Sequence, residues 1–365
     1  MALAKKKAVR SGSSQKAGRA SVKSAPKSKA VKAVKKAAGE AGENKVRRDN
    51  AKPAAGGRGL MVFGLVVGLV IVLAVAGRLR QGPPVKLLPA QVLTVFSAAD
   101  NVPLASPRGI AVGPGGEVYV ADLGNNRVVK FNPDGSVNAT WGSAGSESGQ
   151  FKEPSGVAVD AQGSVYVADA WNGRIQKFSD KGGYVGEIGA KNGNFYSPRN
   201  VAVDGQGFIY VADTGNSCVK KFDAEANLAK RWGEFGSGRD RFQETFGLYV
   251  DRDNRIYVGD AGNRKIKIFD NQGKFQREQI VKGWKTGVSW PTVAVDSAGR
   301  IYAPDAQNQM IWIYSREGKY LGCWGNQPGK DLFAAPLGIA VDGQDNVYVC
   351  NMNRGQIIKL APFKD

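Results

Sequence analysis

Carboxylates at regular spacing are the residues of this sequence best suited to chemistry. One set ends the segments EVYVAD, SVYVAD, FIYVAD, RIYVGD, RIYAPD and NVYVCN, at Asp122, Asp169, Asp213, Asp260, Asp305 and Asn351. A second carboxylate precedes some of them, as Asp160 precedes Asp169. Such pairs can act as general acid and base or as oxygen ligands for Ca²⁺. Because they recur, whereas a catalytic pair is needed once, we interpret them as caps of turns.

Histidine is absent from the 365 residues, which excludes His-based acid–base chemistry, Ser-His triads and His-ligated zinc. The three cysteines, Cys218, Cys323 and Cys350, lie far apart, without metal-ligand spacing, inside strand-like runs. We interpret them as small buried side chains, although their number leaves one disulfide possible. The sequence therefore predicts no catalytic residue, no metal ligand and no cofactor.

A repeat must position these residues. The six segments end 47, 44, 47, 45 and 46 residues apart. Each repeat begins with a small apolar run such as that at residues 156–159, followed by a turn whose fourth residue tolerates positive φ (Gly116, Gly163, Gly207, Asn254, Gly299 or Asp345). A period of this length with only strand and turn signals is typical of a propeller blade. We predict an all-β, six-bladed β-propeller, closed by pairing residues 91–97 with the incomplete sixth repeat.

The repeat resembles that of the NHL-repeat propellers. It contains P-x-G-[IV]-A-V-D, VYVAD and N-x-R-[VI]-x-K-F stretches, the last at residues 172–178, over nearly all of the chain after residue 90. Gly113 in the first repeat and Leu360 in the sixth depart from the pattern. The resemblance implies a six-bladed propeller. It implies no single function, because NHL propellers bind RNA, proteins or other ligands, and some are enzymes. The similar amidating lyases hold zinc with histidines, which this chain lacks.

One face of the propeller is expected to bind. The loops into the inner strands and those between the second and third strands share a face, while the glycine turns lie on the other. The first face carries arginine and aromatic side chains that differ between blades, and these residue types dominate binding hot spots. The candidate ligand-binding residues are Arg108, Trp171, Arg199, Asn200, Phe246, Trp290 and Arg354.

Two segments precede the propeller. Residues 1–58 contain 17 Lys and Arg against three acids, about +14 of the net charge of +19, and form a disordered, Lys/Ala-rich basic tail. Residues 59–77, GLMVFGLVVGLVIVLAVAG, are uncharged and span roughly 28 Å as a helix, so we predict one transmembrane helix. A linker at residues 78–90 then leads to the propeller at residues 91–365.

The charge asymmetry predicts a single-pass protein of the cell membrane, with a cytoplasmic N-terminus and an extracytoplasmic propeller. The tail is expected to bind anionic membrane lipids, with DNA as the alternative because its lysine–alanine segments resemble linker-histone tails. Gly64 and Gly68 form a GxxxG spacing that allows a weak helix-mediated homodimer. A cleavage site at residues 74–76 is the alternative to a retained anchor.

These observations favour binding over catalysis. We predict a membrane-anchored extracytoplasmic binding or scaffold module, not an enzyme, which recognises a protein or another ligand through one face of the propeller. The alternatives are an oxygen-ligated, metal-dependent hydrolase resembling the lactonase propellers, and an RNA-binding NHL module. We do not expect nucleic acid as a partner, because only about +5 of the charge lies after the tail and the location is external.

Overall fold

The computed structural model describes residues 85–97, 102–189, 193–287, 290–329 and 331–364. They belong to one compact unit that covers residues 81–365. The predicted tail, the predicted transmembrane helix and the first part of the linker lie outside the described residues. Within the described ranges, no helix is long and apolar enough to cross a membrane.

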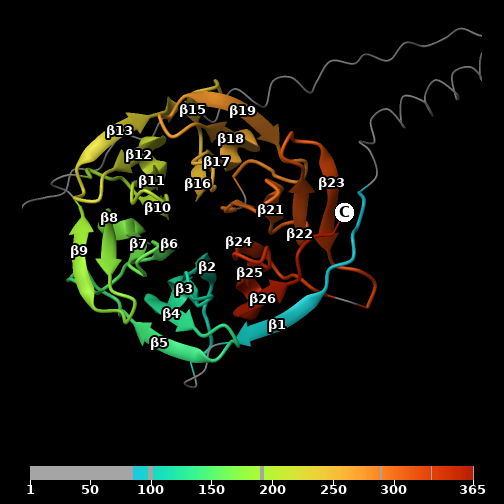
Figure 1. The fold of residues 1–365 in the computed structure, drawn as a ribbon, viewed down its shortest axis with the longest axis horizontal. Coiled ribbons are helices and arrows are strands. Elements are labelled where there is room, and N and C mark those ends of the chain that lie inside the picture. The colour runs from blue at the N-terminus through green and yellow to red at the C-terminus, as the bar shows by residue number, and fades with distance from the viewer. Residues whose placement is uncertain (1–84, 98–101, 190–192, 288–289, 330, 365) are drawn as a thin grey trace, which may run out of the picture. The chain divides into compact units, whose positions relative to one another are not determined.

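The described residues form six four-stranded antiparallel sheets arranged as a ring around a central channel (Figure 1). The all-β, six-bladed propeller predicted from the repeat is therefore confirmed. Each of blades 1 to 5 is a single run of chain. From the channel outward, blade 1 consists of β2 (Pro107–Val112), β3 (Val118–Asp122), β4 (Arg127–Phe131) and β5 (Val137–Trp141). Blade 2 consists of β6 (Pro154–Val159), β7 (Val165–Asp169), β8 (Arg174–Phe178) and β9 (Tyr184–Ile188). Blade 3 consists of β10 (Pro198–Val203), β11 (Ile209–Asp213), β12 (Cys218–Phe222) and β13 (Leu228–Trp232).

Blade 6 combines the two ends of the ring. Its order is β24-β25-β26-β1, with β1 outermost. Blade 6 thus consists of β24 (Pro336–Val341), β25 (Val347–Asn351), β26 (Gln356–Leu360) and β1 (Val92–Ser97). Blade 4 consists of β16 (Thr245–Val250), β17 (Ile256–Asp260), β18 (Lys265–Phe269) and β19 (Phe275–Ile280). Blade 5 consists of β20 (Ala294–Val295), β21 (Ile301–Asp305), β22 (Met310–Tyr314) and β23 (Tyr320–Gly325). A short parallel pair, β14 (Glu234–Phe235) and β15 (Arg241–Phe242), lies between blades 3 and 4 in the sequence.

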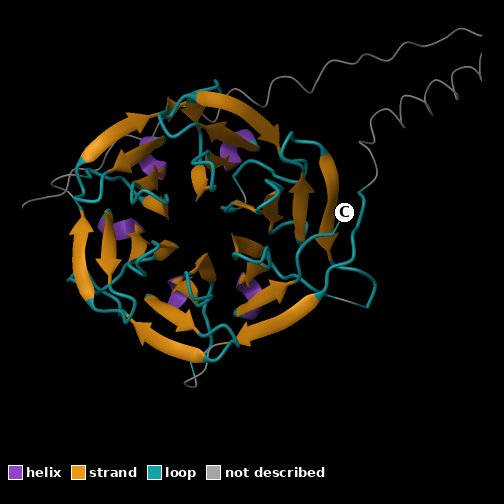
Figure 2. Cartoon of the chain, viewed as in Figure 1, coloured by secondary structure: helices purple, strands orange, loops and turns teal. Residues whose placement is uncertain are grey.

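The two faces of the ring carry different connections. Five blades have a 3₁₀ turn after the second strand, drawn in purple in Figure 2. These turns are η1 (Leu123–Asn125), η2 (Ala170–Asn172), η3 (Thr214–Asn216), η4 (Ala261–Asn263) and η5 (Met352–Arg354). They lie on the side where the inner strands begin, which we call the loop face. On the opposite face, the turn residues predicted to need positive φ have it, including Asn254 at +58° and Asp345 at +64°.

Ring closure follows the prediction from the sequence. Strand β1 pairs antiparallel with β26, with Val95 opposite Ile358 and Phe96 opposite Ile357. The Phe96 ring is buried and lies 5.7 Å from the ring of Phe131 in blade 1, between ring centroids. The first strand thus satisfies the open edge of blade 6 and also contributes to the interface with blade 1.

Residues 85–90, which the sequence analysis assigns to the linker, lie along the outer strand of blade 5. Leu87 forms a parallel bridge with Cys323, and the Leu88 N–H donates to the Cys323 carbonyl at 2.8 Å. The Leu88 side chain packs in the cluster that contains Trp324 and Phe363. The chain therefore crosses from blade 5 to blade 6 before it forms β1.

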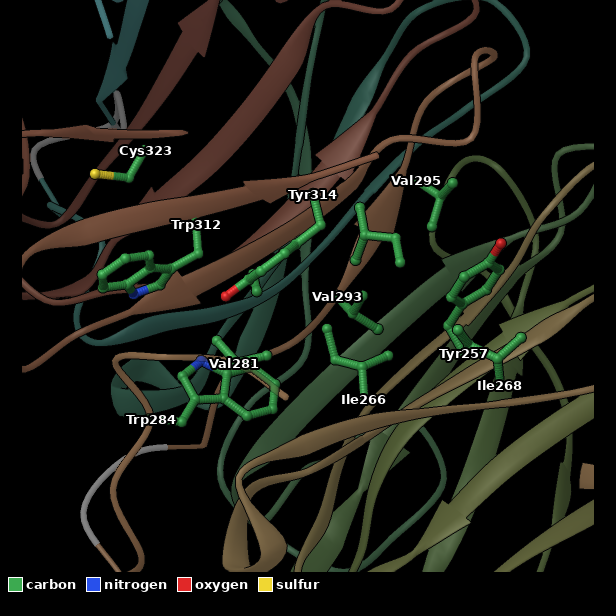
Figure 3. Close-up of a cluster of buried hydrophobic side chains, with 12 residues drawn as sticks. Tyr257, Ile266, Ile268, Val281, Trp284, Val293, Val295, Trp312, Tyr314 and Cys323 are labelled. Atoms are coloured by element: carbon green, nitrogen blue, oxygen red, sulfur yellow. The ribbon is translucent and has the colours of Figure 1, made fainter. Parts of the chain in front are cut away.

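Each blade-to-blade interface has its own apolar core. Figure 3 shows the cluster between blades 4 and 5, where Ile266 and Ile268 of β18 lie in the same cluster as Val293, Trp312 and Tyr314. The second strand of every blade is buried along its whole length, which explains its uninterrupted apolar sequence. All three cysteines are free and buried, as predicted.

The repeated carboxylates cap loops, which confirms their interpretation as structural. In blade 2, the Asp169 carboxylate accepts from the Lys152 N–H at 2.7 Å, from Asn172 Nδ2 at 2.9 Å and from Arg174 Nε at 2.9 Å. Asp160 accepts from the Ser164 N–H at 2.7 Å within its turn. The first group ties the loop that enters the blade to the end of its second strand, and the second group stabilises the turn.

We expect Phe96→Ala to lower the free energy of unfolding by about 3 to 5 kcal/mol, because it leaves a cavity where the ring closes. Val95→Ala is the matched control, since Val95 is 48% exposed on the same strand. Chemical denaturation measures both. Equal and small losses for the two variants would contradict a stabilising role for this strand.

Candidate functional site

The loop-face end of the channel is built from the first residues of the inner strands. Ser155 Oγ donates to the Arg199 carbonyl at 2.9 Å, Asn200 Nδ2 to the Phe246 carbonyl at 3.2 Å, and Thr292 Oγ1 to the Leu337 carbonyl at 3.0 Å. These bonds link blade 2 to 3, blade 3 to 4 and blade 5 to 6. They fix the backbone from which the side chains of the channel mouth project.

Side chains from three different blades lie around the Trp290 ring at this mouth. The guanidinium carbon of Arg108 lies 4.2 Å from the Trp290 ring centroid, and that of Arg199 lies 5.6 Å from it. The Phe246 ring centroid is 5.5 Å away. These residues come from blades 1, 3 and 4, so the site depends on the closed ring. We call Arg108, Glu153, Arg199, Phe246 and Trp290 the mouth cluster.

Glu153 completes the cluster from blade 2. Its carboxylate forms an ion pair with Arg199, with 3.0 Å between Oε2 and Nη1. Glu153 has φ of +59°. Ser106, Ser197 and Ala335 also have positive φ at the same point of their repeats. Its N–H donates to Asn126 Oδ1 at 3.1 Å. The fold therefore sets the position of this backbone, and blade 2 alone among these four repeats places a carboxylate there.

Arg108 is a partly exposed cation whose Nε and Nη1 are buried and have no hydrogen-bond acceptor among the described residues. Burial and the nearby Arg199 charge lower the pKa of Arg108 to about 10, while Glu153 opposes this change. A buried donor without an acceptor and a cation without a close anion both cost free energy. Among the described residues, the mouth cluster therefore has two guanidinium groups and one carboxylate, a net positive charge.

A cleft of about 510 Å³ extends from the mouth cluster over blades 2 and 3. Its walls include Trp171, Tyr196, Arg199, Phe246 and Trp290. Trp171 and Tyr196 are 59% and 68% exposed, so their rings offer free faces. This size is within the range of small-molecule sites, and the aromatic walls suit a flat or ring-shaped ligand.

The structure brings together most of the ligand-binding residues predicted from the sequence. Trp171, Arg199, Phe246 and Trp290 line the cleft, and Arg108 contacts Trp290. Asn200 is buried and lines the central channel beneath the mouth. Arg354 is held apart from these residues in η5 of blade 6, where it donates to the Asp331 carbonyl at 2.6 Å and does not line the cleft.

Sequence reasoning missed Glu153 and Tyr196. Glu153 stands immediately before the Pro154-Ser155-Gly156 start of the second repeat, where the first and third repeats have serine. The fourth repeat also has a glutamate at this point, Glu244, so the sequence alone did not single out Glu153. Tyr196 lies in a loop two residues before Pro198, and the repeat pattern does not single it out.

The opposite end of the channel is rich in carboxylates with structural roles. A hollow there is lined by Asp251, Asp296, Asp342 and Asp345 together with arginines. Asp251 and Asp296 each accept from a tyrosine hydroxyl and from backbone N–H groups of their turns. In the part of the chain that the structure describes, no group of three or more Asp, Glu or Cys residues is placed to hold a metal ion.

Comparison with known proteins identifies the repeat. The NHL repeat family model matches residues 104–131, 151–178 and 195–222, which are the first three repeats. No curated protein matches the chain.

Among solved structures, a virginiamycin B lyase from Staphylococcus aureus is similar at 14% identity, with a TM-score of 0.54, and the match covers 74% of this chain and 99% of the lyase. A gluconolactonase from Xanthomonas campestris is similar at 16% identity, with a TM-score of 0.54 and coverage of 77% and 97%. A streptogramin B lyase has 14% identity, a TM-score of 0.53 and coverage of 74% and 97%. At these identities the likeness establishes the fold.

The prediction that this chain is not an enzyme is corrected by this comparison. Propellers of the same fold include a lyase and a gluconolactonase, which are enzymes. The absence of histidine excludes particular mechanisms, but it does not exclude catalysis on this scaffold.

We expect Arg108→Met to change the free energy of unfolding by less than about 1 kcal/mol, because the lost contact of the guanidinium with Trp290 offsets the removal of two buried nitrogens that have no acceptor among the described residues. Arg127→Met is the control. Arg127 Nε pairs with the buried Asp122 at 2.7 Å, so its loss should cost about 3 kcal/mol or more. Thermal and chemical denaturation compare the two. Equal losses of stability for the two variants would contradict this description of the surroundings of Arg108.

Proposed function

We propose that this chain, an NHL-repeat β-propeller, is an enzyme that hydrolyses a small ester or lactone in the loop-face cleft. The ion pair between Glu153 and Arg199, which lines the cleft and lies against the Trp290 ring, is the observation that carries the proposal. The similarity to a gluconolactonase, which by its name acts on a lactone, supports the reaction class through the fold. The proposal shares the reaction class of the oxygen-ligated, metal-dependent hydrolase considered as an alternative from the sequence, but it assigns the chemistry to Arg199 and Glu153, and it is preferred over a binding or scaffold role.

The chemistry requires one acid–base group and one electrophile. The substrate carbonyl oxygen accepts from the Arg199 guanidinium, which stabilises the negative charge that develops there. Glu153 takes a proton from water as the water oxygen attacks the carbonyl carbon. The bond between the carbonyl carbon and the ester oxygen then breaks, and the leaving oxygen takes the proton from Glu153. The products are an acid and an alcohol, or one hydroxy acid when the substrate is a lactone.

The cleft walls supply binding and orientation. Phe246 and Trp290 are close enough to form a continuous aromatic surface beside Arg199, with 5.5 Å between their ring centroids. Trp171 and Tyr196 extend this surface outward along blades 2 and 3. A ring stacked on it holds the carbonyl group near the guanidinium, which lowers the entropic part of the barrier.

We expect the full-length protein to hydrolyse aryl esters or lactones such as phenyl acetate, dihydrocoumarin and δ-valerolactone. Glu153→Gln should lower kcat roughly 10² to 10⁴-fold, because the amide cannot take the proton from water. Glu187→Gln is the matched control, since Glu187 pairs with Arg174 at 2.9 Å on the same blade, outside the cleft. Product release is followed by absorbance or pH-stat. No turnover with any substrate, or equal rates for Glu153→Gln and wild type, would contradict the proposal.

We also propose that residues 59–77 anchor the enzyme in the cell membrane, with the tail of residues 1–58 in the cytoplasm and the propeller outside. The support is the uncharged 19-residue segment and the basic excess before it. In this arrangement the tail gains about 1 kcal/mol per basic residue close to an anionic leaflet. The GxxxG spacing of Gly64 and Gly68 supports a weak homodimer through the same segment.

We expect protease added to intact cells or spheroplasts to reach the propeller but not the basic tail. The physical reason is the charge asymmetry across the apolar segment, which retains the basic side in the cytoplasm. Epitope tags at the two ends report the outcome on immunoblots. A protected propeller beside digested outer-face controls reverses the proposed orientation.

A further inference from the structure

Arg108 differs from the other arginines that the fold buries. Arg127 and Arg174 direct Nε to Asp122 and Asp169 at 2.7 and 2.9 Å. Arg108 has no such carboxylate partner, and two of its nitrogens lack an acceptor among the described residues. A buried carboxylate thus neutralises the guanidinium groups of Arg127 and Arg174, which have structural roles. The Arg108 guanidinium is not paired in this way.

The position of Arg108 is set by the closed ring rather than by its own interactions. A Cβ built on Gly338 would lie 2.0 Å from the Arg108 carbonyl oxygen, so blades 6 and 1 are in close contact at this residue. The guanidinium stacks on Trp290, which comes from the opposite side of the channel. The cation is therefore pre-positioned at the mouth.

The mouth cluster contains two guanidinium groups and one carboxylate. Arg108 and Arg199 both lie against the Trp290 ring, and Glu153 is paired with Arg199. An entering anion offsets the repulsion by Arg199 and the cost of burying the guanidinium, the two effects that lower the pKa of Arg108. An oxyanion beside the guanidinium also supplies a second negative charge to a cluster that has two guanidinium groups and one carboxylate.

We propose that the substrate carries a carboxylate or phosphate group, bound at Arg108 beside Arg199, on a ring that stacks against Trp290. This inference rests on the proposed function for the identity of the cleft as a substrate site, and it adds the charge of the substrate. Arg108 is then a specificity-determining residue, whereas Arg199 and Glu153 act at the reacting carbonyl.

Binding of non-reacting probes tests this inference without turnover. Isothermal titration with the full-length protein compares benzoate, phenyl phosphate and benzamide, the last being a neutral analogue of benzoate. We expect at least one anionic probe to bind at least tenfold more tightly than benzamide. The relative affinities of benzoate and phenyl phosphate distinguish a carboxylate site from a phosphate site. Equal affinity for benzamide and both anions overturns the proposal.

Variants locate the anion within the site. Arg108→Met should reduce anion affinity at least tenfold and leave benzamide binding unchanged, and Arg108→Lys should retain part of the anion affinity. Arg354→Met is the control, because Arg354 lies on the same face outside the cleft. Unchanged anion affinity in Arg108→Met overturns the inference.

The two proposals can fail separately. Anion binding in a protein that hydrolyses none of the esters or lactones contradicts the proposed function but supports the anion site. Turnover in a protein whose anionic probes bind no better than benzamide contradicts the anion site alone. Glu153→Gln should bind benzoate at least as tightly as wild type while it loses turnover, because a negative charge beside the site is removed.

Discussion

The close approach of the inner strands around the channel is the constraint on which the rest of this structure depends. A Cβ on Gly109 would lie 2.6 Å from the Ser155 carbonyl oxygen, and one on Gly156 would lie 2.6 Å from the Asn200 Cα. Blades 1, 2 and 3 can meet at this distance only because glycine stands at these two positions. At other interfaces the contact is made by a further glycine, Gly338 against the Arg108 carbonyl, or by a small polar side chain, as when Thr292 Oγ1 donates to the Leu337 carbonyl. Close packing at the centre fixes where each inner strand begins, and hence where Arg108, Arg199 and Phe246 project.

A buried hydrogen-bond network holds the entry loop of each blade. The carboxylate keeps its position at the end of the second strand, but the residue that donates to it differs between blades. The carboxylate at the end of the second strand meets Arg174 in blade 2, Lys220 in blade 3 and the Trp312 indole N–H in blade 5. In blade 6, where Gln356 and Ile358 replace the cation, the acid itself is the neutral Asn351. The neutral Asn351 thus stands where blade 6 lacks the cation, whereas Asp305 of blade 5 is a carboxylate that accepts from the neutral donors Asn308 and Trp312. Because this network satisfies the carboxylates of the repeats, the mouth cluster stands out as a different kind of site.

The repeat determined how much of this could be predicted from the sequence. Strand positions, the turns at Asn254 and Asp345, and ring closure by β1 follow from a pattern present in six copies. The path of residues 85–90 along blade 5 could not be predicted, because the parallel bridge of Leu87 with Cys323 has no local sequence signal. The same limit applies to the site. The repeat assigned Arg108, Arg199 and Trp290 to one face, but only the closed ring shows that residues of blades 1, 3 and 5 meet, and that Arg354 does not join them.

The central claim is that the loop-face cleft is where substrate binds and reacts. The indole N–H signals of ¹⁵N-tryptophan-labelled Glu153→Gln protein, assigned by single Trp→Phe variants, test it during titration with an ester that the wild type hydrolyses. The account predicts shifts at Trp290 and Trp171, which line the cleft, and none at Trp141, Trp232 and Trp324, which belong to outer strands and do not line the cleft. Unmoved Trp290 and Trp171 signals at saturating ester would contradict it.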